Sequence, residues 1–193
     1  MTLARAAAWL GDDAAGRPNL ITDAEGRLRL SQGVRVDWHV FQALVAHAAQ
    51  EDAPGGQVEI DYLRRALAEV SGRLLDGRGP GRYSWLATGG LEYEAPALVA
   101  DAAHRLSGLL RAAGDARGAM EAARAGLSLA DSDELLWRDL LLGAEVTGDE
   151  RLLAEVVAEA CERTALDEVM PRMAPETESL IDELLPSWRS SVA

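Results

Sequence analysis

Four residues of one loop combine positive charge with aromatic rings. Arg78, Arg82, Tyr83 and Trp85 all lie in the segment GRGPGRYSWL, residues 77–86. Guanidinium and aromatic groups so close together can stack on a nucleotide base. Tyr83 and Trp85 can equally anchor the loop by burying their rings against neighbouring helices. We expect the anchoring role, and a ligand-binding loop is the alternative.

The rest of the sequence contains few residues or motifs that are typical of metal binding or catalysis. His39 and His47 lie eight residues apart, about 12 Å at the rise of an α-helix, so they cannot hold one metal ion together. No Cys-X-X-Cys or His-Glu-X-X-His motif occurs, and we expect no metal and no cofactor. We expect Cys161, the only cysteine, in a helix core. No sequence pattern singles out a pair of carboxylates as catalytic, so we expect that the protein is not an enzyme.

The charge balance excludes several further functions. The chain has 32 acidic and 19 basic residues, a net charge of −13, and every basic residue is arginine. Schiff-base catalysis and a P-loop both need lysine and are excluded. Residues 1–36 hold five arginines against four acids and carry +1, so residues 37–193 carry −14. We therefore expect no nucleic acid to bind the acidic part of the chain, because its phosphates would be repelled.

Composition also bears on compartment and fold class. A single cysteine is typical of a reducing cytoplasm, where we place the protein. No apolar run reaches the roughly 18 residues of a membrane span, and the N-terminal residues make a poor signal peptide. Aromatic residues make up only 5% of the chain, whereas alanine and leucine are abundant, which favours helices over a β-sandwich.

Apolar residues recur at helical spacing through most of the chain, and Gly or Pro interrupts them. The pattern predicts helices over residues 3–10, 37–49, 58–75 and 91–113 and from Pro175 to about Leu185, and a β-hairpin from residues 20–22 and 27–30. We expect Trp38 and Trp137 in the core because both lie on apolar helix faces.

A Gly-Asp pair recurs after 34 residues. Gly114-Asp115 and Gly148-Asp149 each separate two helical segments, in units that cover residues 100–133 and 134–167. This period and pattern resemble the tetratricopeptide repeat. The resemblance implies an all-α fold of antiparallel helix pairs, about seven helices in all, with the small hairpin at the N-terminus.

The same resemblance implies a concave groove lined by the first helix of each pair. Its register places Asp101, His104, Gly108 and Arg111 of the first unit and Leu135, Arg138, Leu142 and Glu145 of the second on that face. Arg111 and Arg138 can hold a carboxylate of a partner by bidentate hydrogen bonds. The alternative is that both pair internally with Asp101, Asp139 or Glu145 and only solvate the groove.

Four stretches resemble, in order, the bacterial transcriptional activator domain of actinobacterial antibiotic-regulatory-type transcriptional regulators. They are GRLRLSQGVRVDWHVFQALV at 26–45, GRGPGRYSWL at 77–86, SDELLWRDLL at 132–141 and APETESLIDELL at 174–185. The resemblance implies that residues 37–193 are this tetratricopeptide-like domain. Residues 1–36 would then be the remnant of a winged-helix domain, with part of its recognition helix and its wing. The chain would be either a piece of a longer protein or the product of a gene that has lost its DNA reader.

The resemblance implies a non-enzymatic module of a transcriptional regulator. It would bind a protein partner, either transcription machinery or other domains of its parent protein, through the groove. One alternative is a sensor of a small molecule or nucleotide. A further alternative, direct DNA binding through residues 1–36, is weakened by their charge of only +1. Leu135 and Leu142 would serve formation of a homodimer as well as partner binding.

Overall fold

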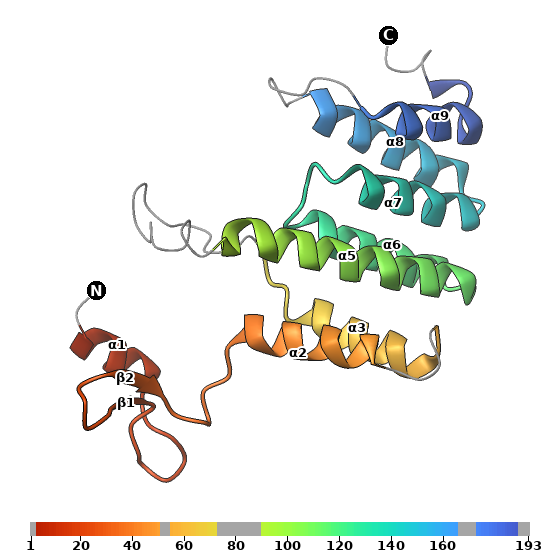
Figure 1. Cartoon of the computed structure of the whole chain (residues 1–193). Helices are drawn as coiled ribbons and strands as arrows, with labels where there is room; N and C mark the ends of the chain where they lie inside the picture. The colour runs from red at the N-terminus through yellow and green to blue at the C-terminus, as the bar shows by residue number, and fades with distance from the viewer. Residues whose placement is uncertain (1–2, 51–54, 73–89, 166–172, 189–193) are drawn as a thin grey trace. The chain divides into compact units, whose positions relative to one another are not determined.

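The computed structural model describes residues 3–50, 55–72, 90–165 and 173–188. Eight helices and two strands are formed within these ranges. The chain divides into two compact units, Met1–Val40 and Phe41–Ala193. The predicted fold class is confirmed, because the chain is mostly helical with a small N-terminal hairpin (Figure 1). The winged-helix origin of residues 1–36 stays a prediction.

The first unit holds one short helix and the hairpin. Helix α1 spans Leu3–Leu10, and it ends before Gly11, which takes a φ of +61° that favours glycine. Strands β1, Leu20–Thr22, and β2, Leu28–Leu30, pair antiparallel with Leu20 opposite Leu30. The elements thus lie where their sequence pattern predicts them.

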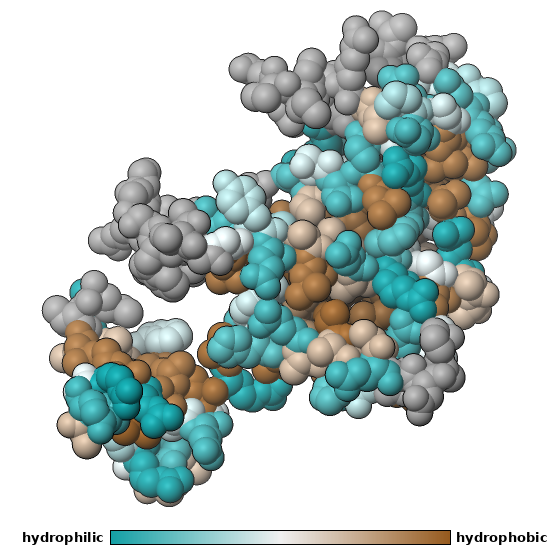
Figure 2. Space-filling view, viewed as in Figure 1, coloured by the Kyte–Doolittle hydropathy of each residue, from teal (hydrophilic) through white to brown (hydrophobic). Residues whose placement is uncertain are grey.

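Large apolar side chains of this first unit remain in contact with solvent. Trp9 is 81% exposed and Leu28 is 52% exposed, and strand β2 has no buried residue. Hydrophobic surface is accordingly visible on this unit in Figure 2. A two-stranded hairpin with so little buried area derives little stability from its own core.

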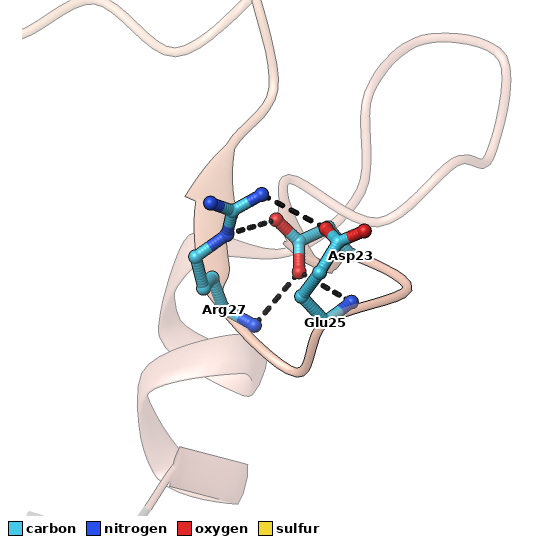
Figure 3. Close-up of polar contacts among 3 residues, drawn as sticks. All are labelled: Asp23, Glu25 and Arg27. Atoms are coloured by element: carbon cyan, nitrogen blue, oxygen red, sulfur yellow. Dashed lines mark hydrogen bonds and ion pairs between the residues drawn. The ribbon is translucent and has the colours of Figure 1, made fainter.

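Local hydrogen bonds compensate in the hairpin turn. Asp23 Oδ1 accepts hydrogen bonds from the backbone N–H groups of Glu25 and Arg27, and Arg27 Nε donates to Asp23 Oδ2 at 2.9 Å (Figure 3). The backbone N–H of Arg27 is the main reason that the pKa of Asp23 is lowered. Asp13 and Arg17 repeat the arrangement ten residues earlier. The recurring sequence Asp-Ala-X-Gly-Arg therefore builds two equivalent turns.

The second unit is a stack of helices. They are α2 Asp37–Ala49, α3 Gln57–Ala68, α5 Leu91–Ala112, α6 Ala116–Leu127, α7 Glu134–Val146, α8 Glu150–Ala165 and α9 Pro175–Leu184. Figure 1 shows α5 to α9 in successive layers, and α7 contacts α5, α6, α8 and α9. Helix α7 is thus the element that holds this part of the stack together.

One helix boundary was predicted wrongly. The sequence predicts a helix over 58–75, but α3 ends at Ala68, with Glu69 as its C-cap. Val70 is β-branched, and Ser71-Gly72 follows with a φ of +138° at Gly72, which a helix cannot accommodate. Apolar residues at helical spacing therefore continue beyond the point where the backbone leaves the helix.

The two Gly-Asp pairs have the same structural role, which is to end one helix and begin the next. Gly114 and Gly148 take φ values of +81° and +69°, so each ends the preceding helix in the left-handed conformation. Asp115 accepts a hydrogen bond from the backbone N–H of Gly118, and Asp149 accepts one from that of Leu152. Both carboxylates therefore cap the next helix, which explains why the pair recurs with the repeat.

Alanine and leucine fill the core between these helices. Trp137 is 3% exposed, and its indole N–H donates to the carbonyl of Asp131, so its predicted core position is confirmed. Trp38 is only half-buried, whereas Phe41 on the same helix is buried. Gly126 of α6 lies close to both α5 and α7, since a Cβ there would lie 2.7 Å from the Cβ of Ala103 and 2.6 Å from a methyl group of Leu136.

Candidate functional site

An open cavity of about 390 Å³ lies between three helices. Its lining comprises His104 and Arg111 of α5, Leu135, Arg138, Asp139 and Leu142 of α7, and Glu176, Ser179, Leu180 and Glu183 of α9. The 34-residue register thus brings five of the predicted groove residues together. The wall formed by α9 was not predicted.

The cavity contains a histidine–carboxylate pair. His104 Nδ1 and Asp139 Oδ2 form a hydrogen bond of 2.6 Å, between side chains that are 44% and 3% exposed. Burial raises the pKa of Asp139, although the bond to His104 and the charge of Arg111 oppose that rise. The sequence indicated Asp139 only as a partner for an arginine. The structure shows that it fixes His104 instead.

The two arginines of the cavity keep much of their hydrogen-bonding capacity. Arg138 Nη1 donates to the hydroxyl of the fully buried Thr177 at 3.2 Å. Arg111 Nε is buried, and it has no hydrogen-bond partner in the described part of the chain. Among the described residues, neither arginine forms an ion pair with Asp101 or Glu145. An unpaired N–H at a cavity wall is a free donor for a ligand.

Helix α9 is anchored to α7 at its N-terminal end. Glu134 Oε1 accepts a hydrogen bond from the backbone N–H of Ala174 at 3.0 Å. Pro175 begins the helix, a position where its missing N–H costs no hydrogen bond. Thr177 and Ile181 of α9 are fully buried. The anchor holds the acidic face of α9 along the cavity.

Three predicted groove residues, Asp101, Gly108 and Glu145, do not line this cavity. Asp101 lines a separate cavity of about 350 Å³ between α2, α3 and α5, and Glu145 is exposed and lines neither cavity. Asp101 lies nearly one helical turn before His104, nearer the N-terminal end of α5. At that point α5 lies beside α2 and α3 rather than beside α9. Arg78, Arg82, Tyr83 and Trp85 of the predicted ligand loop lie outside the described residues.

The separate cavity contains an ion pair that the sequence did not indicate. Arg105 Nε donates to Glu59 Oε1 at 2.7 Å, across 46 residues of sequence. Glu59 is buried and also accepts the backbone N–H of Gly55. The hydrogen bond from Arg105 is the main reason that the pKa of Glu59 is lowered. The pair joins α3 to α5.

Features of other functional classes are sparse in the described ranges. There, no three His, Cys, Asp or Glu side chains gather closely enough to hold a metal ion. Cys161 is half-buried, and the pKa of its thiol is raised by burial and then by Glu178. No described helix is both long and apolar enough to cross a membrane.

Comparisons with protein families, with curated proteins and with solved structures give no match for this chain. The candidate site therefore rests on its own geometry.

Proposed function

We propose that the chain is a non-enzymatic protein-interaction module of a transcriptional regulator, of the bacterial transcriptional activator type. Its partner would be another protein or another domain of the same regulator. The observation that carries the proposal is the gathering of Arg111, Arg138, Leu135 and Leu142 on one face of α5 and α7. This face offers both charged and apolar anchors to a partner.

The chemistry of this face suits a protein segment with a carboxylate beside an apolar side chain. Leu135 is 39% exposed and supplies apolar contact area. Arg138 and Arg111 can donate two parallel hydrogen bonds to a carboxylate. The buried Nε of Arg111 has already lost its water, so pairing it recovers a hydrogen bond at little further desolvation cost.

Capture of a partner from an actinobacterial lysate, read by mass spectrometry, tests the proposal. The wild-type chain is immobilised beside Leu135→Glu, which places a charge on the groove. Val58→Glu is the matched control, because Val58 is 51% exposed in the first turn of α3 and lies outside the cavity. Both new carboxylates lie near helix N-termini, where they are tolerated.

We expect one protein to be enriched on the wild type and on Val58→Glu but absent from Leu135→Glu. Equal recovery on all three chains would contradict the groove as the interaction site. Circular dichroism of the three chains, with equal helicity, controls for their folding.

A small-molecule sensor is the second candidate, and the volume of the cavity favours it. About 390 Å³ falls in the range of small-ligand pockets. Occupancy would change how α9 lies against α5 and α7, and so the surface that a partner meets. Quenching of tryptophan fluorescence by a panel of metabolites would support this function, and a flat response would contradict it.

A further inference from the structure

Side chains of opposite charge line the cavity between α5, α7 and α9. Arg111 and Arg138 project from α5 and α7, and Glu176 and Glu183 line the cavity from α9. The remaining ionisable side chains, His104 and Asp139, are already joined by a hydrogen bond. Two arginines thus line the cavity with two glutamates, and none of these four side chains forms an ion pair in the described part of the chain.

The cationic wall can receive a carboxylate. The side chain of Arg111 makes no hydrogen bond in the described part of the chain, and its buried Nε–H lacks an acceptor. Arg138 donates one hydrogen bond, to the neutral hydroxyl of Thr177. A guanidinium has five N–H donors, so both side chains retain donors for a ligand.

The anionic wall can receive an ammonium group. Neither the carboxylate of Glu176 nor that of Glu183 forms a hydrogen bond or an ion pair within the described ranges, although both residues line the cavity. Each carboxylate has two oxygens that accept hydrogen bonds. A ligand cation would also relieve the repulsion among the acidic groups of α9.

The remainder of the lining is apolar. Leu135, Leu142 and Leu180 lie among the charged groups, from α7 and α9. They can bury an aliphatic side chain of the ligand away from water. A pure anion would be repelled by the glutamates and a pure cation by the arginines, so the walls select against both.

We propose that this cavity binds a zwitterion with an apolar side chain, either a free α-amino acid or a short peptide with both termini charged. The carboxylate would lie against Arg111 and Arg138, and the ammonium against Glu176 and Glu183. The inference rests on the sensing function proposed above and is independent of partner binding.

Isothermal titration of the full chain with four related ligands tests the charge requirement. Leucine carries both charges, N-acetyl-leucine lacks the ammonium, leucine amide lacks the carboxylate, and leucyl-leucine places the charges farther apart. We expect leucine or leucyl-leucine to bind at least about tenfold more tightly than either blocked ligand. The tighter of these two identifies the source as a free amino acid or a peptide.

Two variants assign each charge to its wall. Arg111→Gln removes a side chain that makes no hydrogen bond in the described structure, so it should keep the fold. It should reduce the preference for leucine over leucine amide, whereas Glu183→Gln should reduce the preference for leucine over N-acetyl-leucine. Arg151→Gln and Glu155→Gln are the controls, because these two exposed residues pair on α8 away from the cavity.

Absence of binding by leucine and leucyl-leucine at millimolar concentration would overturn the inference. Equal affinity for all four ligands, or variants that behave as the controls do, would overturn it too. The lysate capture gives an independent result. A partner lost only on Leu135→Glu, with no zwitterion bound, would refute this inference and leave the interaction function standing.

Discussion

His104 on α5 and Asp139 on α7 lie 35 residues apart and are joined by a hydrogen bond of 2.6 Å. The separation is one repeat plus one residue, so the bond joins His104 to the residue that follows its repeat equivalent, Arg138, on the next first helix. It places a half-exposed imidazole over a buried carboxylate. The groove is thereby held by a polar contact as well as by its apolar core.

Asp139→Asn should change how stability depends on pH. Burial raises the pKa of Asp139 above its value in the unfolded chain, so the folded state holds the proton more tightly. The contribution of this carboxyl is fully present below the unfolded pKa and is lost as the pH rises through the raised value. Wild type should therefore exceed Asp139→Asn by the largest margin at acid pH. Urea unfolding of both proteins, across the pH range in which carboxyl groups titrate, measures this difference in stability. A difference that grows as the pH rises would contradict the prediction.

The sequence predicts this groove as far as the repeat extends. Gly114 and Gly148 end helices by local backbone conformation, which is a signal present in the sequence itself. The register then relates Arg111 and Arg138 to one face. Helix α9 lies beyond the repeated pattern, so nothing in the register places Glu176 and Glu183 opposite those arginines. Their position depends on tertiary packing.

Pairing of charged side chains was less predictable than their faces. The sequence suggested an arginine as the partner of Asp139, but Asp139 forms its hydrogen bond with His104. A helix face brings several charged side chains within reach of one carboxylate, so the sequence alone does not select the partner. The Glu59–Arg105 pair spans 46 residues and carries no local pattern. Such pairs depend on the exact separation of two helices.

Glu59→Gln should show the opposite pH dependence. Arg105 lowers the pKa of Glu59, so the contribution of this carboxylate is present above the unfolded pKa and is lost as the pH falls through the folded value. At neutral pH we expect Glu59→Gln to lower the free energy of unfolding by roughly 1–2 kcal/mol. This is the low end for a charged hydrogen bond, because Arg105 is half-exposed. Chemical unfolding at neutral and acid pH measures both. A loss that persists unchanged at acid pH would refute the assignment.

Two glycines should respond oppositely to alanine. A Cβ at Gly126 would lie 2.7 Å from that of Ala103, so Gly126→Ala should overpack the core and cost about 1–2 kcal/mol net of improved helix propensity. At Gly108, on α5, a Cβ would meet nothing within 4 Å. Gly108→Ala should therefore stabilise the chain by roughly 0.5–1 kcal/mol. Thermal unfolding of both variants tests the packing, and destabilisation at Gly108 would show that α5 is packed more tightly there.

Helix α9 should open before the rest of the stack. Arg138 donates to Thr177, and Thr177→Val keeps the shape of the side chain while removing that acceptor. We expect faster amide hydrogen exchange in α9 and little change in α5 and α6, because opening can be local. Ser179→Ala, on the exposed part of the same helix, is the control. Equal acceleration throughout the stack would mean that α9 opens only with global unfolding.

Amide hydrogen exchange of the chain with and without its captured partner tests the interaction surface most directly. We predict protection in α5 around His104–Arg111 and in α7 around Leu135–Leu142, because these segments form the groove. Protection confined to α2 and α3, or to the first forty residues, would contradict the groove as the site of partner binding.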